Sequence, residues 1–115
     1  MIDSNFLKAL ASARELDITF VGSKTGRKYT IPIWFVTDAT KISLLPVGGT
    51  KSKWYRGILK NPRVELQASG KKTAAEAHSV TDKKQIEKIM DGFRAKYGAG
   101  DVKKYYPGQD AAVEL

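Results

Sequence analysis

The fold is decided by the stretch Tyr29-Thr30-Ile31-Pro32-Ile33-Trp34-Phe35-Val36, residues 29–36 of the chain. Its side chains alternate between two faces and are mostly β-branched or aromatic, which is typical of a β-strand. Pro32 cannot donate a hydrogen bond to a neighbouring strand, so a sheet edge, a bulge or a bend is expected there. The preceding turn contains Gly26, which is free to adopt a positive φ.

Five further strands are predicted around this one, separated by turn residues such as Asp38, Ala39 and Thr40. They cover residues 18–21, 41–45, 63–68, 73–80 and 111–115. Six antiparallel strands interrupted by helices favour a closed or partly open barrel, because closure removes unpaired sheet edges. The chain of 115 residues fits one mainly β domain with helices, covering residues 1–115.

Three helices are predicted. The first is short, is capped by Asp3 or Ser4, and presents an apolar face with Phe6, Leu7 and Leu10. The second covers residues 52–60 and ends at Asn61-Pro62, because the residue before proline avoids the helical region.

The clearest helix covers residues 82–97. Gln85 lies three residues after Asp82, as in a capping box, and Gly98 stops the helix. Its apolar stripe consists of Ile86, Ile89, Met90, Phe93 and Tyr97. The tail at residues 101–109 is expected to be irregular, with Val102, Tyr105 and Tyr106 along it.

The positive charge is concentrated in one part of the chain. The net charge is +8, and residues 23–63 hold nine Lys and Arg residues against the single acid Asp38. The remaining residues contain equal numbers of basic and acidic side chains. Such a concentration favours an anionic partner over a merely solvated basic surface.

Several kinds of chemistry are excluded by composition. The chain has no cysteine, which rules out disulfides, thiolate catalysis and cysteine zinc sites. His78 is the only histidine, so a histidine metal cluster is impossible, and a structural or surface role is expected for it. No signal peptide or membrane-spanning stretch is recognisable, so a soluble cytoplasmic protein without membrane association is expected.

Two basic, glycine-containing turns are candidate binding elements, although each also suits an ordinary solvated turn. The turn at residues 23–28 offers hydroxyl groups and cations to a phosphate or carboxylate, from Ser23, Lys24, Thr25, Arg27 and Lys28. The second turn, residues 46–53, leads into a helix, whose N-terminus attracts anions. Its paired Gly48 and Gly49 allow close approach of a ligand to the backbone, and Lys51 and Lys53 add charge.

Aromatic residues lie beside these turns and could hold a planar ring system. They are Trp34 on the second strand, Trp54 and Tyr55 on the second helix, and Tyr105 and Tyr106 in the tail. Taken singly, each of these side chains also suits the protein core.

Four segments together carry a family resemblance: residues 22–28, residues 32–35, Gly48-Gly49 and residues 52–64. The most specific is the tryptophan-bearing helix that closes in Asn61-Pro62-Arg63-Val64. The combination resembles the deazaflavin-dependent nitroreductase and quinone reductase family. That family belongs to the flavin-binding split β-barrels related to pyridoxamine-phosphate oxidase. The resemblance implies a six-stranded antiparallel split barrel that forms a homodimer, with the cofactor in a groove near the subunit interface.

The resemblance also implies roles for individual residues. Lys24 and Thr25, with Ser23 and Arg27 nearby, would bind the cofactor phosphate. Pro32, Trp34, Leu45 and Pro46 would line the ring, and Lys53 and Trp54 would close the site. Backbone N–H groups near Pro46 to Gly49 could stabilise the negative charge of the reduced ring. The family commonly has arginine where Ser23 and Tyr29 stand, and lysine where Val47 stands.

These observations lead to a functional expectation. The protein is expected to be an oxidoreductase that uses bound deazaflavin coenzyme (F-420) or FMN to reduce a small electron-poor substrate, such as a quinone, nitro compound or enone. Related barrels also bind haem. The alternatives are a flavin carrier or sensor without turnover, and a basic barrel that binds single-stranded nucleic acid, as some small barrels with exposed aromatics do. Against the nucleic-acid alternative, no aromatic ladder is predicted on adjacent strands.

Overall fold

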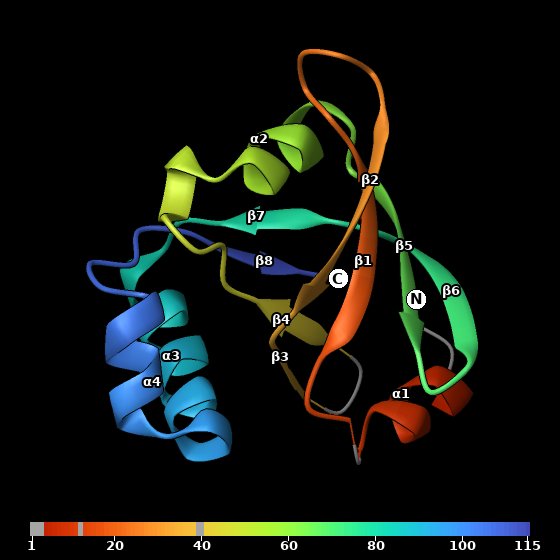
Figure 1. Cartoon of the computed structure of the whole chain (residues 1–115). Helices are drawn as coiled ribbons and strands as arrows, with labels where there is room; N and C mark the ends of the chain where they lie inside the picture. Colours follow the sequence, from red (N-terminus) through yellow and green to blue (C-terminus); the bar gives the residue numbers. More distant parts are fainter. Residues whose placement is uncertain (1–3, 12, 39–40) are drawn as a thin grey trace.

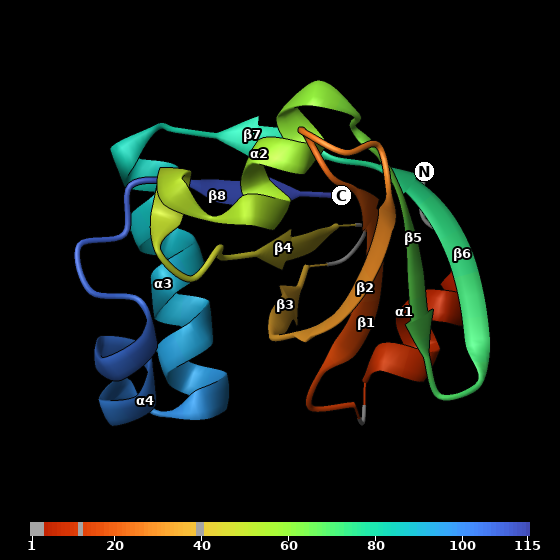
Figure 2. The same ribbon diagram turned by 45° about the horizontal axis from the view of Figure 1, so that its top comes forward.

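Eight strands in two antiparallel sheets and four α-helices make up the described part of the computed structural model, which comprises residues 4–11, 13–38 and 41–115. The helices are α1 (Ser4–Leu10), α2 (Lys53–Lys60), α3 (Lys83–Tyr97) and α4 (Ala99–Tyr105), and a 3-10 turn, η1 (Gly49–Lys51), precedes α2. The first sheet has the order β2-β1-β5-β6, with β1 (Leu16–Val21), β2 (Lys28–Ile33), β5 (Arg63–Ala68) and β6 (Lys71–Glu76). The second has the order β3-β4-β8-β7, with β3 (Phe35–Thr37), β4 (Ile42–Leu44), β7 (His78–Val80) and β8 (Ala112–Glu114) (Figures 1 and 2).

The predicted six strands become eight because two of them change sheets. The strand predicted at residues 29–36 breaks at Trp34, so that β2 pairs with β1 and β3 pairs with β4 in the other sheet. The strand predicted at residues 73–80 breaks at Ala77, whose N–H donates to the Pro62 carbonyl at 2.7 Å. Pro32 lies on β2, the edge strand of its sheet, two residues before the bend, as a residue without a backbone donor requires.

The predicted helix ends agree with the structure at most positions. The Asp82 carboxylate accepts the Gln85 N–H at 3.0 Å, and Gly98 follows the last residue of α3 with a φ of 97°. Helix α2 ends at Lys60, immediately before Asn61. Three predicted turn and cap residues, Asp3, Ala39 and Thr40, lie outside the described residues.

The expectation of an irregular tail was wrong, because α4 covers Ala99–Tyr105. Val102 and Tyr106 are four residues apart, and both are buried against α3. Edge-to-face contact between Tyr106 and Phe93, with ring centroids 5.5 Å apart, stabilises this packing. Tertiary burial therefore outweighs the weak helix propensity of Gly100 in this segment.

Two hydrophobic clusters fill the molecule. The larger contains side chains from both sheets and from α1 and α2; among its members are Phe6, Ile18, Leu66, Trp54 and Phe35. The smaller lies between the second sheet and the α3–α4 pair (Figure 1). No helix in the described part of the chain is long and apolar enough to cross a membrane.

The bend at Trp34 is held by Tyr97 at the end of α3. The two rings are stacked almost in parallel, with centroids 4.1 Å apart. The Tyr97 hydroxyl accepts the Phe35 N–H at 3.0 Å and lies 2.6 Å from the Arg14 carbonyl, to which it donates. One side chain thus links α3, the sheet-crossing bend and the segment before β1.

Helix α2 lies very close to β1, and Gly57 makes this possible. A Cβ atom at Gly57 would be 2.6 Å from the Val21 carbonyl oxygen and 3.1 Å from the Phe20 ring. These distances are shorter than van der Waals contact, and a backbone oxygen in a sheet cannot move aside easily. The distance of α2 from the sheet is therefore set by the absence of a side chain at this position.

We expect Gly57→Ala to lower the free energy of unfolding by ~1–3 kcal/mol, because overpacking outweighs the ~1 kcal/mol by which alanine favours a helix. Urea denaturation followed by circular dichroism measures this. Gly92→Ala on α3 is the matched control, since a Cβ there meets Val36 only at 3.5 Å. The control should be as stable as the wild type or more stable, and an equally stable Gly57→Ala variant would contradict the close-approach argument.

A pH effect is expected at Lys96, whose ammonium donates to the Phe35 carbonyl at 2.9 Å and lies over the Phe35 ring. Burial, together with the charge of Arg14, lowers the pKa of Lys96 to about 8. Between pH 8 and the ordinary lysine pKa of 10.5, the unfolded chain therefore binds more protons than the folded one at this residue. Its contribution to the free energy of unfolding then rises with pH in this window.

Lys96→Met removes this contribution. The stability of the wild type relative to Lys96→Met should therefore increase from pH 7.5 to pH 10, as measured by chemical denaturation at both pH values. Lys88→Met, on the exposed face of the same helix, serves as the control and should keep a constant difference from the wild type. A constant difference for Lys96→Met as well would show that burial does not perturb this ammonium.

Candidate functional site

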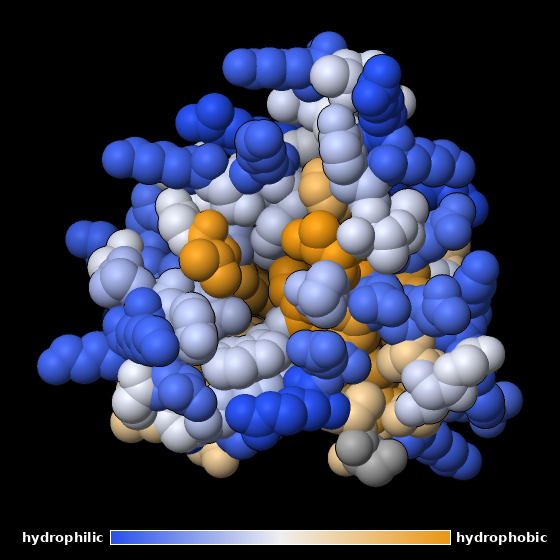
Figure 3. Space-filling view, viewed as in Figure 1, coloured by the Kyte–Doolittle hydropathy of each residue, from blue (hydrophilic) through white to orange (hydrophobic). Residues whose placement is uncertain are grey.

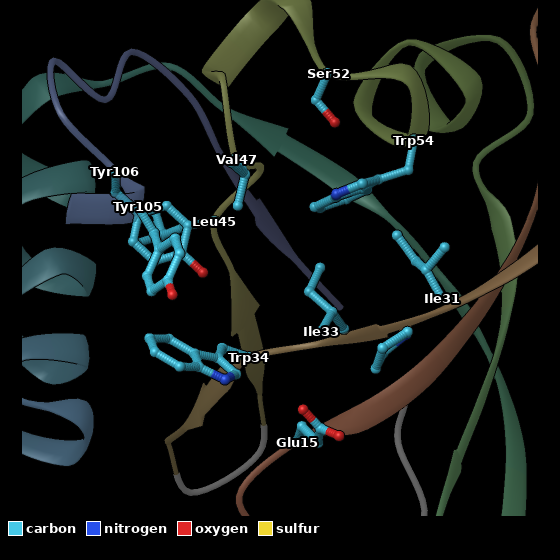
Figure 4. Close-up of a pocket in the computed structure, with 11 residues that line it drawn as sticks. Glu15, Ile31, Ile33, Trp34, Leu45, Val47, Ser52, Trp54, Tyr105 and Tyr106 are labelled. Atoms are coloured by element: carbon cyan, nitrogen blue, oxygen red, sulfur yellow. The ribbon is translucent and has the colours of Figure 1, made fainter. Parts of the chain in front are cut away.

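An aromatic pocket of about 390 Å³ lies where the two sheets, α2 and α4 meet. Trp34 and Trp54 border it from different elements, Val47 points into it from the loop before η1, and Glu15 lies at its lower edge (Figure 4). The complete lining is Glu15, Ile31, Pro32, Ile33, Trp34, Leu45, Val47, Ser52, Trp54, Tyr105 and Tyr106. We call this space the aromatic pocket.

A second space, of about 580 Å³, lies between the β1–β2 turn and α2. Its lining combines cations and hydroxyl groups with apolar side chains: Phe20, Gly22, Ser23, Lys24, Thr25, Tyr29, Ile31, Val47, Ser52, Lys53, Trp54 and Arg56. We call this space the basic groove.

The two spaces are neighbours on one face of the protein. Both are lined by Ile31, Val47, Ser52 and Trp54. Figure 3 shows hydrophobic side chains gathered at the centre of this face, surrounded by hydrophilic ones. Together the spaces can accommodate one elongated ligand that extends from the β1–β2 turn to Trp34.

The charges of the two spaces differ. Among the described residues, the basic groove is lined by Lys24, Lys53 and Arg56 and by no acidic side chain. It also meets the N-terminus of α2, where Ser52 is the N-cap residue and its side chain makes no capping hydrogen bond. Free N–H groups and the helix dipole attract anions at such an end. In the aromatic pocket, Glu15 is the one charged lining residue within the described part of the chain.

The β1–β2 turn is braced from three sides. The Gly22 N–H donates to the Arg27 carbonyl at 2.8 Å, and Gly26 has the predicted positive φ, 69°. Lys60 reaches from the end of α2 to the Ser23 carbonyl at 3.1 Å. The Thr25 hydroxyl lies 3.2 Å from that of Tyr29. These contacts fix the turn and tie it to the last residue of α2.

Trp34, in the wall of the aromatic pocket, is held in place by neighbouring aromatic rings. Besides its stacking on Tyr97, it meets Tyr105 edge-on at 5.6 Å. Tyr106 completes the wall, and its burial raises the pKa of its hydroxyl well above the ordinary value.

Eight of the thirteen predicted binding residues line these spaces. Ser23, Lys24, Thr25 and Lys53 line the basic groove, Pro32, Trp34 and Leu45 line the aromatic pocket, and Trp54 lines both. The possible pocket walls Tyr105 and Tyr106 also line the aromatic pocket.

The other five predicted residues do not line either space: Arg27, Pro46, Gly48, Gly49 and Lys51. Arg27 and Lys51 are exposed, and Pro46 is buried. The Gly49 N–H donates to the Pro46 carbonyl at 2.9 Å, and the Thr50 N–H donates to Asp110 at 3.0 Å. These two N–H groups are thus already used within the chain and are not directed at a ligand.

Sequence reasoning missed several lining residues. Val47 lies in the predicted turn, at a place where the resembling family commonly has lysine, and Ser52 and Arg56 lie in the segment 52–64 that carries the resemblance, but none of the three was predicted to bind. Glu15 precedes the first strand and gave no pattern. Only the packing of α1, β1 and the bend brings it to the pocket.

The fold is that of the split-barrel proteins related to pyridoxamine-phosphate oxidase. An F-420-H2-dependent reductase (FDR-A) aligns with a TM-score of 0.66 and 19% identity over 88% of this chain and 92% of that chain. The haem storage protein HutZ from Vibrio cholerae aligns with a TM-score of 0.72 and 13% identity, over 97% and 86% of the two chains. A putative pyridoxamine 5'-phosphate oxidase from Listeria innocua gives 0.69 and 15% identity, over 96% and 88%.

These TM-scores establish a shared fold, whereas the family is established by a match to a family model. No curated protein matches the chain. Residues 6–112 match a bacterial family that is described as "Uncharacterized protein conserved in bacteria" (DUF2255). This match covers nearly the whole chain, and the protein therefore belongs to the DUF2255 family.

Proposed function

We propose that the protein binds a phosphorylated flavin-type cofactor, deazaflavin coenzyme F-420 or FMN, and uses it to reduce a small electron-poor substrate. The observation that carries this proposal is the continuity of the basic groove with the aromatic pocket through Ile31, Val47, Ser52 and Trp54. A ligand with an anionic tail and a flat apolar ring system matches both parts. The similarity of the fold to that of the F-420-H2-dependent reductase supports the same assignment.

The phosphate would bind at the β1–β2 turn. Lys24 supplies charge there, Ser23 and Thr25 supply hydroxyl groups, and all three line the groove. Lys53 and Arg56 face the same space from α2. Because Lys60 and the Gly22–Arg27 hydrogen bond already fix the turn, binding costs little additional ordering of the backbone.

The ring would lie between Trp54 and the β2 side chains Ile31 and Pro32, with Val47 above the junction. These groups exclude water from one side of the ring and fix its plane. When bound, a flavin or deazaflavin supplies hydride or electron transfer, and the protein supplies orientation and electrostatics. The substrate would then occupy the end of the pocket at Trp34, where Tyr105 and Glu15 offer hydrogen-bonding groups.

Titration of the purified protein with FMN and, separately, with coenzyme F-420 tests the proposal directly. We expect a micromolar or lower dissociation constant for one of them, read from tryptophan quenching. Single-stranded oligonucleotides form the comparison arm. Binding of neither cofactor, together with oligonucleotide affinity that falls steeply with salt, would favour the nucleic-acid alternative. Light scattering in the same samples tests the expected homodimer.

Lys24→Ala should raise the cofactor dissociation constant at least about tenfold, because it removes a charged hydrogen bond worth ~1.5 kcal/mol or more. Isothermal titration calorimetry gives the value. Arg27→Ala is a matched control, since it removes a cation from the same turn that does not line the groove. Equal losses in both variants would indicate a diffuse effect of net charge and contradict a phosphate contact at Lys24.

Val47→Trp should also weaken cofactor binding about tenfold or more, because the larger ring fills the junction of the two spaces. Val47 is 57% exposed, so folding tolerates the change. Leu59→Trp is the control: Leu59 is 58% exposed on α2 and lines neither space. Cofactor absorbance, which the added tryptophan does not affect, reports binding. Unchanged affinity in Val47→Trp would place the ring elsewhere.

A turnover assay, which measures oxidation of the bound reduced cofactor by a substrate, distinguishes an enzyme from a carrier or sensor. The bound cofactor is reduced anaerobically with dithionite and mixed with a quinone, a nitroaromatic compound or an enone in a stopped-flow instrument. Oxidation of the bound cofactor faster than that of free cofactor under the same conditions is the result expected for an oxidoreductase. Slower oxidation than in free solution would favour a carrier or sensor.

A further inference from the structure

The loop at residues 46–50, between the two spaces, is hydrogen-bonded to Asp110 and Gln109, about 60 residues later in the chain. The Asp110 carboxylate accepts the Thr50 N–H through Oδ1 and the Thr50 hydroxyl through Oδ2, both at 3.0 Å. The neighbouring Gln109 side chain donates to the Pro46 carbonyl at 2.9 Å and to the Ala111 carbonyl at 2.7 Å. Two adjacent side chains thus hold both ends of the segment from Pro46 to Thr50.

The Asp110 carboxylate also packs directly against the backbone of Gly49. Gly49 has a φ of 61°, a conformation that favours glycine, and a Cβ atom there would overlap the Asp110 carboxylate. The paired glycines were expected to admit a ligand to the backbone. At Gly49, the group that approaches is instead a carboxylate of the chain itself.

The loop held by Asp110 and Gln109, together with the residue that follows it, provides two side chains that line both the aromatic pocket and the basic groove. Val47 lies within the loop, and Ser52 follows it as the N-cap residue of α2. The direction of the first turn of α2, and so the placement of Lys53 and Trp54, depends on where the loop ends. The fastening residues lie just after Tyr106, which is itself a pocket wall.

We propose that Asp110, supported by Gln109, is a positioning residue for the cofactor site: it holds the loop at residues 46–52 so that Val47, Ser52 and the start of α2 face the ligand. Asp110 lines neither space and does not touch the ligand itself. The loop-holding role stands on the hydrogen bonds alone, whereas the effect on ligand binding rests on the proposed function.

Two variants separate the hydrogen bonds from the charge. Asp110→Ala removes both acceptors, whereas Asp110→Asn keeps an acceptor for the Thr50 N–H and can donate to the Thr50 hydroxyl. Glu76→Ala, an exposed acid on β6, controls for the loss of one negative charge. Hydrogen exchange measured by mass spectrometry compares a peptide spanning residues 46–56 with one spanning β5 and β6. Titrations with FMN and coenzyme F-420 follow on the same samples.

We expect Asp110→Ala to speed exchange at residues 46–56 about tenfold without changing β5 and β6, and to raise the cofactor dissociation constant several-fold. Asp110→Asn should restore both quantities, and Glu76→Ala should leave both unchanged. Wild-type exchange at residues 46–56 in Asp110→Ala would overturn the proposal. Faster exchange with unaltered cofactor affinity would overturn it as well, because the loop position would then not matter to the site. If the wild type binds neither cofactor, the proposed function fails, and the exchange measurement alone decides the loop-holding role.

Discussion

The architecture depends on one junction, where the Tyr97 hydroxyl meets the backbone at the bend between β2 and β3. The chain leaves one sheet and enters the other at Trp34, so the peptide groups there cannot be satisfied by continuous strand pairing. The Tyr97 hydroxyl accepts the Phe35 N–H and donates to the Arg14 carbonyl, and the residues Tyr97 and Phe35 are buried. A buried backbone group without a partner costs free energy, so the hydrogen bonds of this side chain stabilise the crossing from one sheet to the other.

The candidate site follows from that crossing. Because the bend turns Trp34 out of both sheets, its ring can stack on Tyr97 and form the end of the aromatic pocket. At the other end, the missing side chain of Gly57 lets α2 lie against β1 and places its N-terminus beside the β1–β2 turn. Two local constraints far apart in the sequence thereby create an aromatic end (Figure 4) and an adjoining basic end.

Local patterns in the sequence were sufficient for most elements of the fold. The Asp82 cap and the Asn61-Pro62 stop each act through neighbouring residues, and the structure has them where predicted. The alternation at residues 29–36 correctly indicated extended chain, although the structure divides the predicted single strand into β2 and β3. The sheet changes at Trp34 and Ala77 could not be predicted, because they depend on which strand pairs with which. Helix α4 was missed for a similar reason: Val102 and Tyr106 gain from helix formation only when α3 is there to cover them.

The same distinction applies to the site. Lys24, Lys53 and Trp54 could be predicted because short motifs carry them. Val47 and Ser52 could not, since their positions depend on Asp110, which lies 60 residues from its partner Thr50. Gly48 and Gly49 were predicted to let a ligand approach the backbone closely. At Gly49 the group that approaches the backbone is instead a carboxylate of the chain itself.

The exposed apolar surface gives an independent argument for the location of the site. In the described part of the chain, four large hydrophobic side chains are exposed: Tyr29, Val47, Leu59 and Tyr105. Three of these line the basic groove or the aromatic pocket, and Leu59 alone lies elsewhere. Single exposed apolar residues are ordinary on a protein surface, but their gathering around two adjoining hollows indicates a binding surface. Because the described cations that line the two hollows, Lys24, Lys53 and Arg56, all line the basic groove, the surface favours a ligand that is apolar and flat at one end and anionic at the other.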